Sequence, residues 1–246
     1  MKREPLFNVP AVVVALLGAF FLIHIVREYA LSDLEQHYFD ALFAFIPLRY
    51  ENSLVLGGAL PGGLPAEIWT FVTYAFIHGS WVHLGVNAIW FLPFGSAVAR
   101  RFGALRFLGF FAVTAAAGAL AYLFVHAGED SAVVGASAAI SGTMAGAIRF
   151  AFQRGGPLGF WRSNDDEAYR VPAIPLSGVL RDPRVVIFLV VWVGINLIFG
   201  AGQLQIVGDD QPVAWQAHIG GFLAGLLLFD WFDPVPRAEH GDATQH

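Results

Sequence analysis

The sequence contains no cysteine and few charged residues, and both absences narrow the class of protein. Without cysteine, the chain forms no disulfides and has no thiolate ligands for a metal. Charged residues make up 13% of the 246 residues, whereas a soluble domain normally carries about 25%. The net charge of −5 includes no basic stripe, so we do not expect nucleic acid as a partner.

Apolar residues are abundant and come in long blocks. They account for 57% of the chain, and the mean hydropathy is +0.60. A helix that crosses a bilayer needs about 20 mostly apolar residues. Six segments approach this length, at about residues 9–28, 83–99, 104–125, 134–152, 184–202 and 214–232. The sequence therefore predicts an all-α membrane protein, a bundle of six transmembrane helices.

The basic residues predict the orientation of this bundle. If the N-terminus is cytoplasmic, the outer segments hold only Arg27 and Arg49. The other twelve of the fourteen basic residues are inside: Lys2, Arg3, Arg100, Arg101, Arg106, Arg149, Arg154, Arg162, Arg170, Arg181, Arg184 and Arg237. This positive-inside bias predicts that both termini are cytoplasmic. One lysine beside thirteen arginines is typical of a GC-rich bacterial genome, so we expect a multi-pass protein of a bacterial inner membrane.

The connections are of unequal length, and we interpret residues 1–246 as a single membrane domain. An outer loop is expected at residues 30–80 and an inner loop at residues 153–182. Ser32 followed by Glu35 predicts a capping box and a short helix inside the outer loop. Leu56-Gly57-Gly58 and Pro61-Gly62-Gly63-Leu64-Pro65 predict turns in the same loop.

Three of the predicted spans carry polar side chains at one depth. Ser137 and His218 each lie twelve residues before the charged residue at the inner end of their span, a rise of about 18 Å. Asn87 lies thirteen residues before such a residue, about 20 Å. His83 precedes Asn87 by four positions and shares its helix face. These groups are expected about 10 Å below the outer edge of a hydrocarbon core of about 30 Å.

These residue types together suggest nucleophilic catalysis. A serine hydroxyl becomes a good nucleophile when a base, usually histidine, takes its proton, so Ser137 and His218 form the natural pair. No Asp or Glu lies in any span at this depth, which favours a dyad over a triad with a carboxylate. The Ser137 backbone N–H, the Asn87 amide and the His83 ring could donate to the oxyanion of an attacked amide.

Other interpretations of the same residues exist. A lone intramembrane serine usually bonds to its own helix, and a lone asparagine often joins two helices. The α/β-hydrolase elbow requires a glycine where this chain has Ala139. His83 and His218 lack a third metal ligand at their level, which leaves a bis-histidine haem site as a minor alternative. A small transporter would need polar groups along a whole path, whereas here they cluster at one level.

The ordered motifs resemble those of rhomboid intramembrane serine proteases. The matching pieces are His78-x4-His83-x3-Asn87, Gly135-Ala136-Ser137 and Ala217-His218-x2-Gly221-x3-Gly225. The resemblance implies a six-helix rhomboid core, with Ser137 as nucleophile and His218 as general base. It assigns Asn87 and His83 to the oxyanion hole. It also implies that the substrates are transmembrane helices cut near the outer face, and that no cofactor is needed.

Two positions depart from the usual rhomboid pattern. Ala138 follows the serine where the common motif has glycine, and Ser141 stands where rhomboids often have an aromatic residue near the histidine. Some rhomboid-like proteins are inactive and only bind membrane clients, and this is the alternative to proteolysis. Such proteins typically lack the serine or the histidine, and this chain has both. The sequence indicates neither the substrate nor the oligomeric state.

Overall fold

The computed structural model describes residues 9–51, 60–158, 166–200 and 213–236. These residues form helices and no strands, with one isolated antiparallel bridge between Phe45 and Val133. The α-helices are α1 (Ala11–Ala30), α2 (Asp33–Phe43), α3 (Gly63–Thr73), α4 (Trp81–Phe102), α5 (Ala104–Val125), α6 (Ser137–Ile148), α7 (Leu176–Val179), α8 (Pro183–Gly200) and α9 (Trp215–Phe232). Short 3₁₀ helices span Pro47–Tyr50, Tyr74–Phe76 and Asp166–Arg170. The predicted all-α class is therefore confirmed for the described residues.

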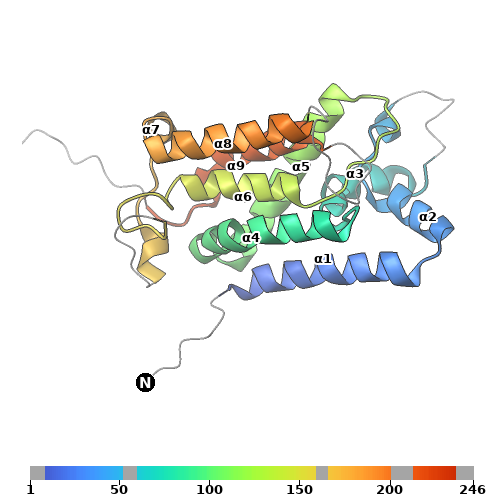
Figure 1. Cartoon of the computed structure of the whole chain (residues 1–246), viewed down its shortest axis with the longest axis horizontal. Helices are drawn as coiled ribbons and strands as arrows, with labels where there is room; N and C mark the ends of the chain where they lie inside the picture. The colour runs from blue at the N-terminus through green and yellow to red at the C-terminus, as the bar shows by residue number, and fades with distance from the viewer. Residues whose placement is uncertain (1–8, 52–59, 159–165, 201–212, 237–246) are drawn as a thin grey trace, which may run out of the picture.

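The helices form an elongated bundle (Figure 1). Helices α1, α4, α6 and α8 run along its long axis, and α2 and α3 lie together at one end. Among the described residues, α1, α4, α5 and α8 are long and apolar enough to cross a membrane. Helix α6 is apolar but has only 12 residues. The prediction of six spans with two cytoplasmic termini goes beyond these four helices and stays a prediction.

Helix α6 is the centre of the bundle. Every residue of α6 after Ser137 is buried, because α4, α5 and α9 all pack against it. Its sequence is rich in small residues, which let neighbouring helices approach closely. Helix α9 also has small residues where it contacts α6. A Cβ atom on Gly221 would collide with the Ala138 main chain, and one on Gly225 would collide with the Gly142 main chain.

The predicted span 134–152 is longer than α6, and contacts with distant segments lie at both ends of the helix. Before Ser137 the chain is not helical, since Gly135 has a φ of +114° and donates its N–H to the Tyr74 carbonyl. After Ile148 the buried Arg149 side chain donates to the carbonyls of Ile174 and Leu226 and pairs with Asp230 at 2.9 Å. Apolar composition alone does not distinguish a helix from a buried irregular segment.

The outer segment contains more helix than predicted. The Ser32–Glu35 capping box is present at the start of α2, with the Ser32 N–H donating to the Glu35 carboxylate at 2.8 Å. This hydrogen bond holds the pKa of Glu35 below its usual value. Residues 61–65 were expected as a turn, but α3 begins at Gly63 after Gly62 adopts a φ of +96°. The predicted turn at residues 56–58 lies outside the described residues.

Candidate active site

Ser137 is the first residue of α6, and the segment before it is held by backbone contacts. Val133 pairs with Phe45 in both directions, and the Gly135 N–H donates to Tyr74. Gly135 also lies against the His83 ring, where an added Cβ would be 2.7 Å from Nε2. Because this position has a positive φ and no space for a side chain, only glycine fits here. As the first residue of α6, Ser137 has its hydroxyl at the helix N-terminus, where backbone N–H groups lack helical partners.

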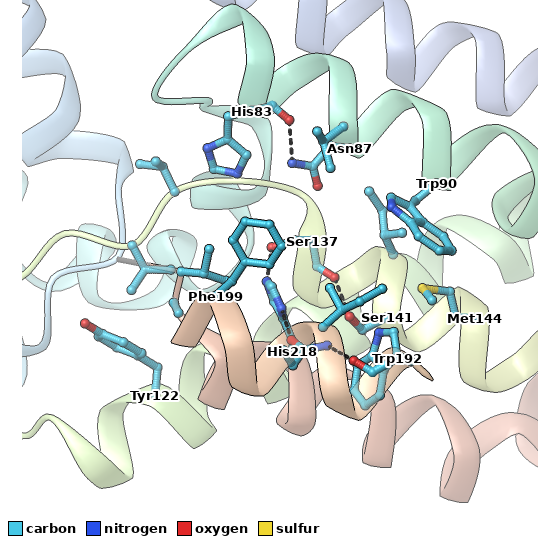
Figure 2. A pocket seen from close by; sticks show the side chains of 18 of the residues that line it. His83, Asn87, Trp90, Tyr122, Ser137, Ser141, Met144, Trp192, Phe199 and His218 are labelled. Carbon is cyan, nitrogen blue, oxygen red and sulfur yellow. Dashed lines mark hydrogen bonds between the residues drawn. The ribbon is translucent and has the colours of Figure 1, made fainter. Parts of the chain in front are cut away.

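Ser137 and His218 are brought together by the packing of α6 on α9. The Ser137 hydroxyl and His218 Nε2 are 2.7 Å apart, and Figure 2 shows this contact at the centre of the site. The two residues are 81 positions apart in the sequence. They meet because Gly221, one turn beyond His218, lets the α9 backbone reach Ala138. The two side chains are therefore in hydrogen-bond contact, and their catalytic roles stay predictions.

Helix α4 supplies the two other predicted residues. Ser80 caps α4 by accepting a hydrogen bond from the His83 N–H at 3.1 Å. One turn later, the Asn87 amide nitrogen donates to the His83 carbonyl at 2.9 Å. An amide nitrogen carries two N–H groups, so a donor role toward substrate would use the second one. Asn87 is 4% exposed.

The predicted residues line one cavity of about 350 Å³, shown in Figure 2. Helices α4, α6, α8 and α9 contribute to its walls, which include His83, Asn87, Ser137, Ser141, Asn196 and His218. Apolar side chains such as Met144 and Trp192 line it as well. An apolar cavity with a few convergent polar groups is the usual form of a small-molecule or peptide-binding site.

Ser141 shares the cavity but has a different local role. Its hydroxyl donates to the Ser137 carbonyl at 2.7 Å, a back-bond typical of serine inside a helix. Its side chain is 3% exposed. The two serines are thus distinguished by their partners, since the Ser137 hydroxyl faces a histidine and the Ser141 hydroxyl faces a backbone oxygen.

A known protein family matches most of this chain. The family model of the Rhomboid domain matches residues 65–232, which include His83, Asn87, Ser137 and His218. This chain belongs to the rhomboid family. It is a multi-pass membrane protein of that family, with several apolar helices of spanning length.

Two curated proteins show how distant the relatives of this rhomboid are. It is 25% identical over 166 residues to Rhomboid protease GlpG of Serratia proteamaculans (strain 568), a match that covers 67% of this chain and 48% of the relative. It is 29% identical over 163 residues to RHOMBOID-like protein 7 of Arabidopsis thaliana, covering 66% of this chain and 42% of the relative. The matched region therefore spans less than half the length of either relative.

Sequence reasoning missed one polar contact in this rhomboid. Asn196 of α8 is 5% exposed, and its Oδ1 lies 2.6 Å from His218 Nδ1. Asn196 is the one polar side chain in a bulky apolar span, and that isolation was the available signal. No spacing rule connects it to His218, because the two residues lie on different helices.

The metal interpretation gains no support from the part of this rhomboid that the structure describes. No three His, Cys, Asp or Glu side chains gather there as a metal site would need. A haem iron bound by His218 would need one of its ring nitrogens. Both nitrogens have protein partners, Ser137 on one side and Asn196 on the other.

Proposed function

We propose that this rhomboid is an intramembrane serine endopeptidase that cleaves transmembrane-helix substrates near the outer face of the membrane. The observation that carries the proposal is the 2.7 Å contact between the Ser137 hydroxyl and His218 Nε2 in a polar-lined cavity. Membership of the rhomboid family and the protease name of the Serratia relative support it. In this proposal residues 1–246 form one six-span domain in a bacterial inner membrane, with both termini cytoplasmic and no cofactor.

The first half of the reaction forms an acyl-enzyme. His218 Nε2 takes the hydroxyl proton while the Ser137 oxygen bonds to the carbonyl carbon of the scissile amide. The carbonyl oxygen becomes an oxyanion, for which the Ser137 N–H, the second Asn87 N–H and the His83 ring are the proposed donors. His218 then gives its proton to the amide nitrogen, the carbon–nitrogen bond breaks, and the amine product leaves.

The second half returns the enzyme to its starting state. A water molecule gives a proton to His218 Nε2 as its oxygen bonds to the acyl carbon. The protonated His218 then returns that proton to the Ser137 oxygen, and the ester bond breaks to release the acid product. The same two side chains therefore serve both halves, and no carboxylate is required.

The nucleophile assignment is tested with the two serines of α6. Wild type in liposomes should cleave a transmembrane substrate, and a fluorophosphonate probe should label the Ser137 peptide as identified by mass spectrometry. Ser137→Ala and His218→Ala should abolish both signals. Ser141→Ala is the matched control and should retain cleavage, because the Ser141 hydroxyl donates to the Ser137 carbonyl and not to His218.

An adduct on Ser141 instead of Ser137 would overturn the mechanism. The client-binding alternative would be supported by a different result. In that result, wild type and Ser137→Ala bind a membrane client equally well, and wild type does not cleave it. Labelling that survives in His218→Ala would show that His218 is not the base.

A further inference from the structure

Asn196 occupies an unusual place in α8. Its neighbours along the helix include Ile187, Val190, Val191 and Leu197, all large apolar side chains more than half exposed on the bundle surface. Asn196 instead turns inward and is 5% exposed. An amide group removed from water in a membrane span costs free energy unless it is hydrogen-bonded. Both polar atoms of this amide have partners, and one partner is the histidine of the proposed dyad.

The two contacts fix which way the amide faces. Its Nδ2 lies 2.8 Å from the Trp192 carbonyl, one turn earlier in α8. A carbonyl oxygen only accepts hydrogen bonds, so the atom facing Trp192 must be the NH₂ group. The atom facing His218 is consequently Oδ1, which also only accepts. The reverse assignment would place two acceptor oxygens against each other.

This orientation determines the tautomer of His218. Since Oδ1 of Asn196 only accepts, Nδ1 of the ring must carry a hydrogen to make the 2.6 Å contact. A neutral imidazole carries one hydrogen, so Nε2 is then an unprotonated acceptor. Nε2 is the nitrogen that lies 2.7 Å from the Ser137 hydroxyl. The chain of contacts from Trp192 through Asn196 and His218 to Ser137 is thus directional.

We propose that Asn196 is a positioning residue that holds His218 in the Nδ1-protonated tautomer and in the ring orientation that accepts the Ser137 proton. The inference rests on the proposed function, and it extends the proposed dyad by a third, uncharged member. When His218 carries both protons during the reaction, Nδ1–H continues to donate to Asn196. In other histidine sites, an acceptor bonded to the far ring nitrogen likewise fixes the tautomer and the ring orientation.

A neutral amide suits this position better than a carboxylate. An aspartate would place a charge inside the bundle, and charges at such depth are costly. The amide oxygen provides the acceptor without that cost. Ser141, the polar neighbour one turn beyond the nucleophile, does not substitute for it, because the Ser141 hydroxyl is committed to the Ser137 carbonyl.

The first test separates positioning from mere packing by kinetics. Asn196→Leu removes the acceptor and should lower kcat by about 10- to 100-fold, with KM changed by less than about threefold. Asn196→Asp keeps an oxygen acceptor for Nδ1 but loses the amide donor to Trp192 and brings the cost of a buried charge. Its turnover should therefore lie between that of wild type and that of the leucine variant, about tenfold above the latter. Thr114→Val is the matched control. It removes a similar back-bond, from a fully buried Thr114 hydroxyl to the Phe110 carbonyl at 2.8 Å, and should leave kcat near wild type.

The second test reads the tautomer directly and does not depend on activity. In ¹⁵N-histidine-labelled protein in detergent, the His218 signal is assigned by its loss in His218→Gln. Wild type should show the Nδ1–H tautomer, and Asn196→Leu should lose that preference.

An Nε2–H tautomer in wild type would overturn the inference. An Asn196→Leu variant with unchanged kcat, or one in which only KM changes, would also overturn it. If wild type neither cleaves nor labels, the proposed function fails, while the nitrogen signals still decide whether Asn196 orients the ring.

Discussion

At the residue scale, the site depends on which donor or acceptor each side chain has left after its local hydrogen bonds are made. Ser141 uses its hydroxyl on the Ser137 carbonyl, whereas the Ser137 hydroxyl meets His218. Asn87 uses one N–H on the His83 carbonyl and keeps a second one. The local bonds therefore distinguish the two serines and leave Asn87 with one donor for a substrate.

Asn87→Ala should lower kcat more than it raises KM, because the donor is proposed to act on the developing oxyanion. Losing one such donor in a soluble protease costs about 10²- to 10³-fold in kcat. We expect a smaller loss here, about 10- to 100-fold, since the Ser137 N–H and His83 remain as donors. Steady-state cleavage in liposomes measures both constants. Ile89→Ala is the control on the same helix, with a side chain that is 69% exposed. A raised KM with unchanged kcat would refute the donor role.

Most of these residues were predictable from the sequence, and the reason is physical. Polar side chains in apolar spans are rare, so Ser137, His218, His83 and Asn87 stood out, and helix rise placed them at one depth. The partner of Asn196 was not predictable. Rise along a helix gives depth, but it does not give the rotation of one helix against another, and that rotation brings the Asn196 amide to His218.

At the scale of elements, α6 and α9 pack backbone to backbone, and that closeness brings the Ser137 hydroxyl and His218 Nε2 within 2.7 Å. The contacts of Gly221 and Gly225 with the α6 main chain leave no space for a side chain. The glycine face of α9 was visible in the sequence. The early end of α6 was not. Arg149 directly follows that end and contacts Asp230 and two distant carbonyls, and the spacing of residues along one helix does not reveal such contacts.

Gly221→Ala should destabilise the bundle and reduce cleavage, although alanine favours helix over glycine. The new Cβ would overlap the Ala138 backbone, and overpacking of this kind costs about 1–3 kcal/mol. Gly194→Ala in α8 is the matched control, since nothing lies within 4 Å of its added Cβ. It should be neutral or stabilising by up to about 1 kcal/mol. Unfolding in detergent compares the two, and equal stabilities of both variants would show that the α6–α9 contact is not this tight.

At the scale of the whole molecule, the short length of α6 fits the prediction that Ser137 lies below the membrane surface. Its 12 residues rise about 18 Å, which is less than the hydrocarbon thickness of about 30 Å. At the opposite end, the Arg101 guanidinium binds Asp233 at 2.8 Å and the Tyr169 and Val171 carbonyls. Arg101 thereby connects the ends of α4 and α9 to the segment that the charge pattern predicts to be cytoplasmic.

The absence of cysteine makes the predicted orientation directly testable, because every single-cysteine variant reports one position. Asp130, between α5 and α6, and Arg154, after α6, are both exposed and lie on opposite sides of the predicted span. In intact spheroplasts a membrane-impermeant maleimide should label Asp130→Cys, and it should label Arg154→Cys only after permeabilisation. The positive-inside bias predicts this result, because it places Asp130 outside and Arg154 in the cytoplasm. Labelling of Arg154→Cys alone in intact spheroplasts would invert the topology and place Ser137 near the cytoplasmic face, and so would move the proposed cleavage to the inner side of the membrane.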